Sequence, residues 1–214
     1  MTGLNVLVSA GPTCEDLDPV RFLTNRSSGK MGYSIASAAA CRGADVTLVS
    51  GPTELSAPAG VNVVSIRSAE DMYREITGRQ KDADIIIKVA AVADYRPACV
   101  SDNKIKKKED GSDLSLPLER TSDILRHLGE HKKEGQFLCG FSMETENMLE
   151  NSRKKLEKKH LDLIAANNVK VSGAGFQGDT NVLTLISRDS ETELPLMSKW
   201  DAANRLLDEI MKMR

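Results

Sequence analysis

The sequence is poor in the features that mark several large classes of protein. Aromatic residues make up only 4% of its 214 residues, which argues against the base-stacking surfaces of single-strand nucleic-acid binders. The net charge is −2 and the isoelectric point is near 6.0, whereas general nucleic-acid binding requires a basic excess. We therefore expect a protein that has no nucleic-acid partner.

Paired cysteines and long apolar runs are also missing. The four cysteines form no C-x-x-C pair, which is typical of reduced thiols in the cytoplasm. No apolar run approaches the ~20 residues that span a bilayer. The N-terminus leads directly into an expected strand, with no signal peptide before it. We expect a cytoplasmic protein without a membrane segment. The composition, with 40% hydrophobic and 28% charged residues and no repeats or linkers, is typical of a single globular domain over residues 1–214.

The most informative stretch covers residues 8–36. An apolar run over residues 4–8 stops at Ser-Ala-Gly-Pro-Thr, which predicts a buried strand ended by turn residues. About sixteen loop residues follow, and Ser-Ser-Gly-Lys at residues 27–30 then opens an alanine-rich helical run that reaches Cys41. In an α/β sheet such a loop lies over the carboxyl ends of the strands, where ligands bind.

The start of this helix is a candidate anion site. Free backbone N–H groups at Ser28, Gly29 and Lys30, the helix dipole and the lysine side chain all suit a phosphate or carboxylate. The simpler interpretation is that Ser27 or Ser28 merely caps the helix. The preceding loop favours a site, because it holds more polar side chains than a connector of the usual four to six residues needs.

Alternating strands and helices predict the fold. Strands are expected at residues 45–49 and 61–66, a helix that opens with a capping box at Ser68–Asp71 follows, and residues 83–93 read as a central strand buried on both faces. Later segments predict helices over 123–134, 146–159 and 199–213, and strands over 137–142 and 161–166. We predict an α/β, Rossmann-like, doubly wound and mainly parallel sheet. To it are added a β-hairpin flap over 104–119 and an antiparallel pair formed by 180–187 and 193–197.

Three patterns resemble known motifs but lack their context. Residues 173–178 match G-x-G-x-x-G, yet a strand is expected after them where the dinucleotide fingerprint requires a helix. His127 and His131 fit the inverted zinc motif H-x-x-E-H, but Gly129 weakens the helix that the motif needs. Gly29-Lys30 lacks the P-loop spacing. We predict an inter-strand loop, two solvated histidines and no protein-held metal.

Two basic clusters are candidates for phosphate binding. Lys104 opens the run Lys-Ile-Lys-Lys-Lys on the flap, ten residues after Asp94, and can return over the same strand ends. Lys155 and Lys159 are spaced i,i+4 on a helix, where like charges weaken the helix unless an anion lies between them. The alternative for both clusters is a solvated charged surface.

Several motifs occur together in one order along the chain: A-G-P-T, D-P-V-R, N-R-S-S-G-K-M-G, A-A-V-A-D-Y-R-P, K-I-K-K, G-F, E-T and L-D-L-I. Together they resemble the bacterial phosphopantothenoylcysteine synthetase family, the ligase half of a bifunctional coenzyme A biosynthesis protein. The resemblance implies a homodimeric ligase that joins 4′-phosphopantothenate and L-cysteine with CTP and Mg²⁺. The intermediate in that family is an acyl-cytidylate. Both of its steps need charge neutralised on phosphates and a carbonyl held in place.

The resemblance also implies roles for individual residues. Asn25 matches the asparagine that holds the acyl-cytidylate, Arg21 a second contact to the intermediate, and Lys104 a flap lysine needed for activation. The implied nucleotide-binding residues are Lys88, Val89, Ala90, Asp94, Lys104, Ser122, Asp123, Ile124, Leu125, Phe141, Lys155 and Lys159. The implied substrate- and phosphate-binding residues are Gly11, Ser27, Ser28, Gly29, Lys30 and Ala91.

The sequence departs from the family pattern in three places. The decarboxylase half that normally precedes this segment is absent, which fits either a stand-alone synthetase or an excised domain. Lys88 and Cys14 replace the methionine and arginine that are more common there. Two rival classes stay open: a nicotinamide or flavin oxidoreductase, and a nucleotide-binding module without turnover. The absence of G-x-G-x-x-G after the first strand opposes the oxidoreductase, and the joint presence of Asn25, Lys104 and Lys155 opposes the inert module.

Overall fold

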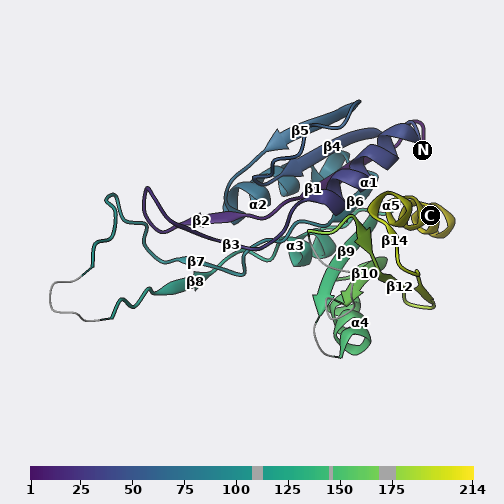
Figure 1. Ribbon diagram of the computed structural model, residues 1–214. Coiled ribbons are helices and arrows are strands. Elements are labelled where there is room, and N and C mark those ends of the chain that lie inside the picture. The colour runs from purple at the N-terminus through teal and green to yellow at the C-terminus, as the bar shows by residue number, and fades with distance from the viewer. Residues whose placement is uncertain (108–112, 145–146, 169–176) are drawn as a thin grey trace.

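The computed structural model describes residues 1–107, 113–144, 147–168 and 177–214 (Figure 1). Its central sheet contains the parallel strands β1 (Asn5–Ala10), β4 (Asp45–Ser50), β5 (Val61–Ser65), β6 (Ile85–Lys88), β9 (Phe137–Glu144) and β10 (Leu163–Asn168). The antiparallel strands β12 (Leu183–Ile186) and β13 (Glu191–Glu193) complete it. The order across the sheet is β13-β12-β10-β9-β6-β1-β4-β5.

Helices cover both faces of this sheet. Alternation along β1 directs Val6 and Val8 into the core on one face and Leu7 into the core on the other. The first core includes side chains of α1 (Lys30–Cys41) and α5 (Lys199–Met213); the second includes those of α2 (Ala69–Arg79), α3 (Ile124–Glu130) and α4 (Met148–Lys158). A short 3-10 turn, η1 (Gln80–Asp82), precedes β6. The predicted doubly wound, mainly parallel sheet is confirmed.

Two details of the predicted elements differ from the structure. The N-cap residue of α1 is Gly29, with φ of 78°, and not a serine. Ser27 Oγ accepts a hydrogen bond from the Gly29 backbone N–H at 3.4 Å. The predicted C-terminal strand pair is divided in two. β12 pairs with β13 at the sheet edge, while β11 (Thr180–Asn181) pairs with β14 (Met197–Ser198) in a separate two-stranded sheet. Both pairs are antiparallel, as predicted.

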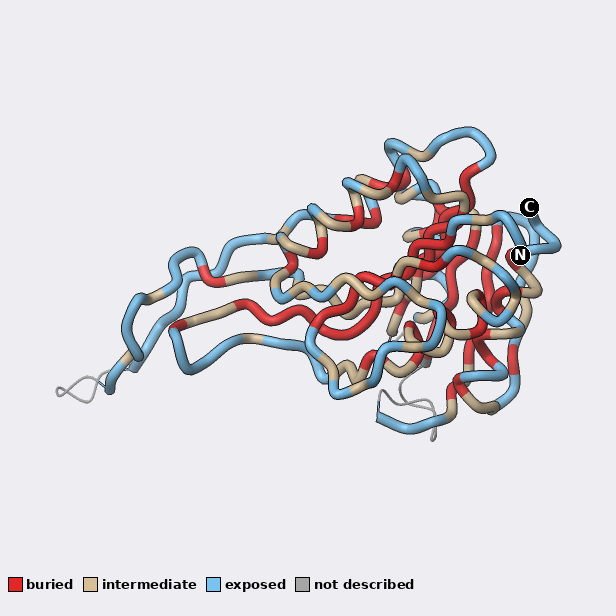
Figure 2. The backbone as a smooth tube through the Cα atoms, turned by 90° about the horizontal axis from the view of Figure 1, so that it is seen from above, coloured by how far each residue is buried: buried red, intermediate tan, exposed pale blue. Residues whose placement is uncertain are grey.

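A long arm projects from the carboxyl ends of the strands (Figure 1). We use "the arm" for residues 14–24, 95–107 and 113–120. It contains two antiparallel pairs, β2 (Cys14–Asp16) with β3 (Phe22–Thr24) and β7 (Tyr95–Pro97) with β8 (Leu118–Arg120). Figure 2 shows buried positions concentrated in the sheet and its helices, while the arm is largely exposed or intermediate.

The predicted flap corresponds to the outer part of this arm. A hairpin is present, but its paired strands are β7 and β8 at the base of the arm, so the ladder lies outside most of the 104–119 segment. Residues 108–112, within the predicted flap, lie outside the described residues. The backbone N–H of Ile105 instead donates to the Asp18 carboxylate at 3.0 Å, which fixes that part of the arm to the β2–β3 pair.

Candidate active site

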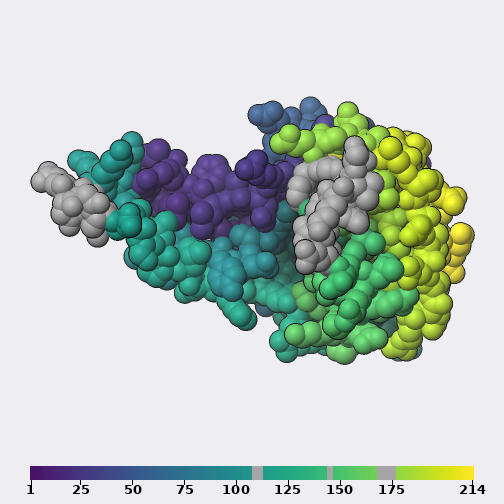
Figure 3. Space-filling model, turned by 60° about the horizontal axis from the view of Figure 1, so that its bottom comes forward, coloured from purple at the N-terminus to yellow at the C-terminus, as the bar shows by residue number. Residues whose placement is uncertain are grey.

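A cavity of about 820 Å³ lies over the carboxyl ends of β1 and β6. Topology explains its position: β4 and β5 lie on one side of β1, while β6, β9 and β10 lie on the other. Open parallel sheets bind ligands in the crevice at such a switch point. In Figure 3 a hollow separates N-terminal segments in purple and teal from C-terminal segments in green and yellow. We take this cavity as the candidate active site.

The structure brings together every candidate site residue except Arg21 and Lys104. The nucleotide-side candidates that line the cavity are Lys88, Val89, Ala90, Asp94, Ser122, Asp123, Ile124, Leu125, Phe141, Lys155 and Lys159. The candidates for the acyl substrate and its phosphate that line it are Gly11, Asn25, Ser27, Ser28, Gly29, Lys30 and Ala91. Their residue-by-residue roles remain predictions, since lining a cavity does not identify what a side chain binds.

One wall of the cavity is the start of α1. The helix approaches β1 closely: a Cβ on Gly32 would lie 2.6 Å from the Cβ of Ala10 and 3.0 Å from the backbone oxygen of Ser9. Glycine is therefore required at position 32 for this packing. Because the first residues of α1 line the cavity, the positive end of the helix dipole faces it. Lys30 beside it donates to the Asp179 carboxylate at 2.7 Å and holds the pKa of that carboxyl below its usual value.

Two buried hydroxyls that sequence reasoning missed fix the cavity floor. Ser9 Oγ accepts from the backbone N–H groups of Val89 and Ala90, both at 3.1 Å. Thr13 Oγ1 accepts from the backbone N–H of Ala93 at 3.0 Å. Both hydroxyl residues have zero exposure. They attach the segment after β6 to the end of β1; the signal in the sequence was a serine and a threonine around the end of an otherwise apolar strand.

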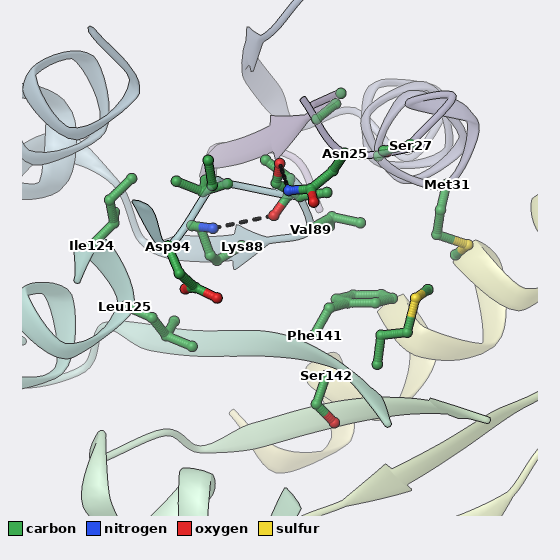
Figure 4. Close-up of a pocket in the computed structure, with 18 of the residues that line it drawn as sticks. Asn25, Ser27, Met31, Lys88, Val89, Asp94, Ile124, Leu125, Phe141 and Ser142 are labelled. Atoms are coloured by element: carbon green, nitrogen blue, oxygen red, sulfur yellow. Dashed lines mark hydrogen bonds between the residues drawn. The ribbon is translucent and has the colours of Figure 1, made fainter. Parts of the chain in front are cut away.

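Asn25 and Lys88 converge on successive carbonyl groups of that segment (Figure 4). The Asn25 amide nitrogen donates to the Ala91 carbonyl at 3.0 Å. The Lys88 ammonium donates to the Ala90 carbonyl at 3.2 Å. In this view the ammonium lies between the Asn25 amide and the Asp94 carboxylate. An amide that donates to a protein carbonyl still has a second N–H and an acceptor oxygen for a ligand.

Cations dominate the electrostatics of the cavity. The basic residues that line it are Lys30, Lys88, Arg120, Arg126, Lys155, Lys158, Lys159 and Lys199. Among the described residues only two carboxylates line it, Asp94 and Asp123. Lys159 pairs with Asp123 at 3.0 Å. Burial acts to raise the pKa of Asp123, but the Arg126 backbone N–H and the Lys159 ammonium outweigh it and leave that pKa lowered. The net positive lining suits a ligand with several negative charges.

The opposite wall combines apolar and amide side chains. Phe141 of β9 lies across from Met31 of α1 in Figure 4, and Met31 accepts a hydrogen bond from the Asn181 amide, with nitrogen and sulfur 3.7 Å apart. Cavity residues without a predicted role are Ala10, Met31, Gly32, Val92, Ala93, Thr121, Ser142, Met143, Asn167 and Asn181, besides Arg120, Arg126, Lys158 and Lys199. The first five lie within the family motifs, whereas no motif marks the next five, which come from β9, β10, β11 and the segment before α3.

Arg21 and Lys104 lie on the arm and do not line the cavity. The Arg21 guanidinium donates to Asp18 through Nε at 3.0 Å and Nη2 at 2.6 Å, and to the Ile105 carbonyl at 2.7 Å. The fully buried Asp18 carboxylate therefore organises the arm around residue 105. The Arg21 guanidinium is the main reason that the pKa of Asp18 lies well below its usual range.

The prediction of two solvated histidines holds for His131, which is exposed, but not for His127, which is half-buried. His127 stacks on His131 with ring centroids 4.2 Å apart, and its Nδ1 lies 3.1 Å from the Tyr73 hydroxyl. In the part of the chain that the structure describes, no three His, Cys, Asp or Glu residues cluster as a metal site. Most of the G-x-G-x-x-G stretch, residues 173–176, lies outside the described residues.

Among the described helices, none has the length and apolar character needed to cross a membrane.

The fold and the cavity define a Rossmann-like α/β protein with a cationic ligand site at its topological switch point. The chain belongs to the DNA/pantothenate metabolism flavoprotein C-terminal domain family, which it matches over residues 1–213. It is 49% identical over 212 residues to the coenzyme A biosynthesis bifunctional protein CoaBC of Bacillus subtilis (strain 168), covering 98% of this chain and 52% of that protein. It is 44% identical over 209 residues to the CoaBC of Escherichia coli (strain K12), covering 97% and 52%.

Solved structures agree with the sequence comparison. A crystal structure of the C-terminal domain of a coenzyme A biosynthesis bifunctional protein CoaBC superposes with a TM-score of 0.85 at 42% identity, covering 100% of this chain and 96% of that one. The chain spans about half the length of the curated relatives that it matches. The predicted family is confirmed.

Proposed function

We propose that this chain is a phosphopantothenate–cysteine ligase of coenzyme A biosynthesis. The observation that carries the proposal is the cavity at the switch point, which gathers the family-motif residues Asn25, Asp94 and Lys159 within a positively charged wall. The membership of the family and the coenzyme A biosynthesis role in the names of the relatives support the same reaction. We propose CTP as its nucleotide; the amino-acid substrate is L-cysteine and the acid is 4′-phosphopantothenate.

The reaction takes two steps. The pantothenate carboxylate oxygen attacks the α-phosphorus of CTP, the bond to the β-phosphate oxygen breaks, and pyrophosphate leaves. The cysteine amine then attacks the acyl carbon of the acyl-cytidylate, CMP leaves with the electrons of the acyl–oxygen bond, and the amine proton passes to solvent or phosphate. Both steps require neutralised phosphate charge and an oriented carbonyl more than a protein nucleophile. The eight basic residues of the cavity suit the first requirement.

Positions in the cavity suggest which end holds which group. The start of α1, with Gly29 and Lys30, suits the phosphate or carboxylate of the pantothenate-derived substrate. Lys155 and Lys159 at the end of α4 suit the triphosphate. Asn25 lies near Ser27 at the α1 side of the cavity, and its amide donates to the Ala91 carbonyl, where we propose that the acyl-cytidylate forms. Its free N–H can donate to the acyl or phosphate oxygen while its carbonyl oxygen accepts from the incoming amine.

Magnesium is proposed as a companion of the triphosphate. Asp94 and Asp123 are the carboxylates that line the described cavity, and they make no group of three metal-binding side chains with any other described residue. Mg²⁺ commonly keeps several waters and binds through phosphates and one or two carboxylates. The donor set fits an ion that arrives with CTP, in which case it neutralises phosphate charge.

We also propose a homodimer in which the arm carries Lys104 and Arg21 to a partner. Seven large apolar side chains of the arm are exposed: Val20, Phe22, Tyr95, Val100, Leu114, Leu116 and Leu118. This many exposed large apolar side chains on one projecting segment support contact with another protein. The absence of Lys104 and Arg21 from the cavity lining of their own chain supports a role in the site of a second copy. We further propose that a decarboxylase half accompanies this segment in a longer native chain and that the protein is cytoplasmic.

Pyrophosphate release tests the proposed function. We expect release from CTP and Mg²⁺ that depends on 4′-phosphopantothenate, and formation of phosphopantothenoylcysteine when cysteine is added. Parallel reactions contain ATP in place of CTP. Release with ATP alone would keep the reaction and overturn the nucleotide. Absence of release with both nucleotides, by protein that is folded and dimeric, would overturn the ligase. Bound-cofactor absorbance of the purified protein checks the oxidoreductase alternative.

A further inference from the structure

Lys88 places an ionisable side chain in the cavity lining at the end of a central strand. It ends β6, in the middle of the sheet, and its side chain is half-buried in the cavity floor. Within the described residues the Ala90 carbonyl is the one hydrogen-bond acceptor of its ammonium, at 3.2 Å. An ammonium has three N–H donors, so two remain for a ligand.

The position of this ammonium lies between the two ends of the cavity. On one side lies Asn25. Its amide donates to the Ala91 carbonyl at 3.0 Å, and this carbonyl is the next one along the chain after the Ala90 carbonyl that Lys88 contacts. On the other side, Lys159 is close enough to repel it electrostatically. Figure 4 shows its nitrogen between Asn25 and Asp94. If the acyl end meets Asn25 and the outer phosphates meet Lys159, the group between them is the α-phosphoryl group.

We propose that the side-chain ammonium of Lys88 binds the α-phosphoryl group of the nucleotide, which is the phosphorus that accepts the carboxylate. This inference rests on the proposed ligase function and gives the Lys88 side chain a specific role within it. Charge placed there neutralises the non-bridging oxygens in both steps: when pyrophosphate leaves, and when the same phosphate leaves with CMP.

Electrostatics give the assignment a measurable property. Burial and the nearby Lys159 ammonium lower the pKa of Lys88 to about 8, and the opposing carboxylates of Asp123 and Asp94 only partly offset them. A phosphate bound to the ammonium favours its protonated form and raises this pKa again. We therefore expect nucleotide binding to take up more protons at pH 8 than at pH 6.5.

The test is isothermal titration calorimetry of the full dimeric chain with CTP, CMP and cytidine, in pairs of buffers that differ in ionisation enthalpy. Lys88→Met keeps the length and removes the charge. Lys88→Arg keeps the charge and has no titration in this range. Lys81→Met is the matched control, because Lys81 is exposed and lies outside the cavity. Thermal melts confirm that each variant is folded.

We expect Lys88→Met to weaken CTP and CMP by a similar factor of about ten or more and to leave cytidine unchanged. It should also abolish the proton uptake at pH 8. Lys88→Arg should keep phosphate-dependent binding without proton uptake, and Lys81→Met should match wild type. Wild-type binding whose proton uptake stays the same from pH 6.5 to pH 8 would overturn the inference even if Lys88→Met fails to fold.

Two other results would also decide the matter. Loss of CTP affinity with unchanged CMP affinity would overturn the assignment to the α-phosphoryl group. Equal affinities and equal proton uptake in wild type and folded Lys88→Met would overturn the inference while leaving the ligase intact. A wild type that binds neither CTP nor ATP would instead overturn the proposed function and this inference with it.

Discussion

The Asp18 carboxylate accepts two hydrogen bonds from the Arg21 guanidinium, at 3.0 and 2.6 Å, while its own side chain is fully buried. The same carboxylate also accepts the backbone N–H groups of Val20, Arg21 and Ile105. One charge thus connects two segments of the arm that are 87 residues apart in sequence. Arg21 therefore has a structural partner in its own chain, in addition to the role proposed for it at the intermediate.

Asp18→Asn should loosen this connection. Because the folded-state pKa of Asp18 is depressed, its stabilising effect is complete above the unfolded value of about 4 and is lost as the pH falls below it. We expect the Tm of the variant to lie below wild type at pH 7 and the gap to narrow below pH 4. Asp102→Asn, at an exposed arm position, is the control. A gap that stays constant from pH 7 to pH 3 would contradict the assignment.

Asn25→Asp should separate the two steps of the reaction. The carboxylate keeps the acceptor but loses the donor N–H, so we expect acyl-cytidylate to accumulate while its transfer to cysteine slows by about 10²–10³. Rapid quench followed by mass spectrometry measures both species. Asn62→Asp, at an exposed position of β5, should behave as wild type. Normal amide formation by Asn25→Asp would remove Asn25 from the proposed mechanism.

Lys104→Gln should block the activation step, and mixing experiments can locate the site that Lys104 serves. If the arm serves the partner, unfolding and refolding an equal mixture of Lys104→Gln and Asn25→Asp yields heterodimers with one intact site. About a quarter of wild-type activity should then return, since half of the dimers are mixed and one of their two sites is intact. A mixture of Asn25→Asp and Asp94→Asn, two cavity variants, should stay inactive. No recovery in the first mixture would place Lys104 at its own chain's site.

Gly32→Ala tests the close packing of α1 on β1. The added methyl would lie 2.6 Å from the Ala10 Cβ, so we expect a loss of about 1–3 kcal/mol in the free energy of unfolding. Gly78→Ala is a matched control in a helix, because nothing lies within 4 Å of the added Cβ. It should stabilise the protein by about 0.5–1 kcal/mol. Urea unfolding measures both, and equal effects of the two substitutions would contradict the packing.

Local signals in the sequence were sufficient for most of the sheet and its helices. Ser68 and Asp71 form the predicted capping box, because both partners lie within one turn. The apolar run at residues 83–93 was only partly a strand: β6 ends at Lys88, and the residues after it are held by Ser9 and Thr13. Only residues 85–87 of this run are buried, while residues 88–93 are half-buried and line the cavity. Hydrophobicity alone does not distinguish a buried strand from an apolar loop that lines a ligand cavity.

The features that escaped prediction depend on contacts between distant segments. Gly29 became the N-cap of α1 because it adopts a φ of 78° close to Gly11 and Thr53, a constraint that the adjacent serines do not reveal. The position of Lys104 away from the cavity follows from the contact between Ile105 and Asp18. Motifs gathered the right residues for one wall of the cavity, whereas Asn167 and Asn181 line it only because the fold brings β10 and β11 to the same cavity as α1.

The ion pair between Lys159 and Asp123, 3.0 Å long, has a consequence for turnover. In the proposed ligase, the Asp123 carboxylate competes with the phosphates of the nucleotide for the Lys159 ammonium. We expect a triphosphate with Mg²⁺ to displace the carboxylate more effectively than the products, each of which carries fewer charges. Lys159 thus stays paired between cycles, and we expect Asp123 to favour product release while it lowers the affinity for the substrate.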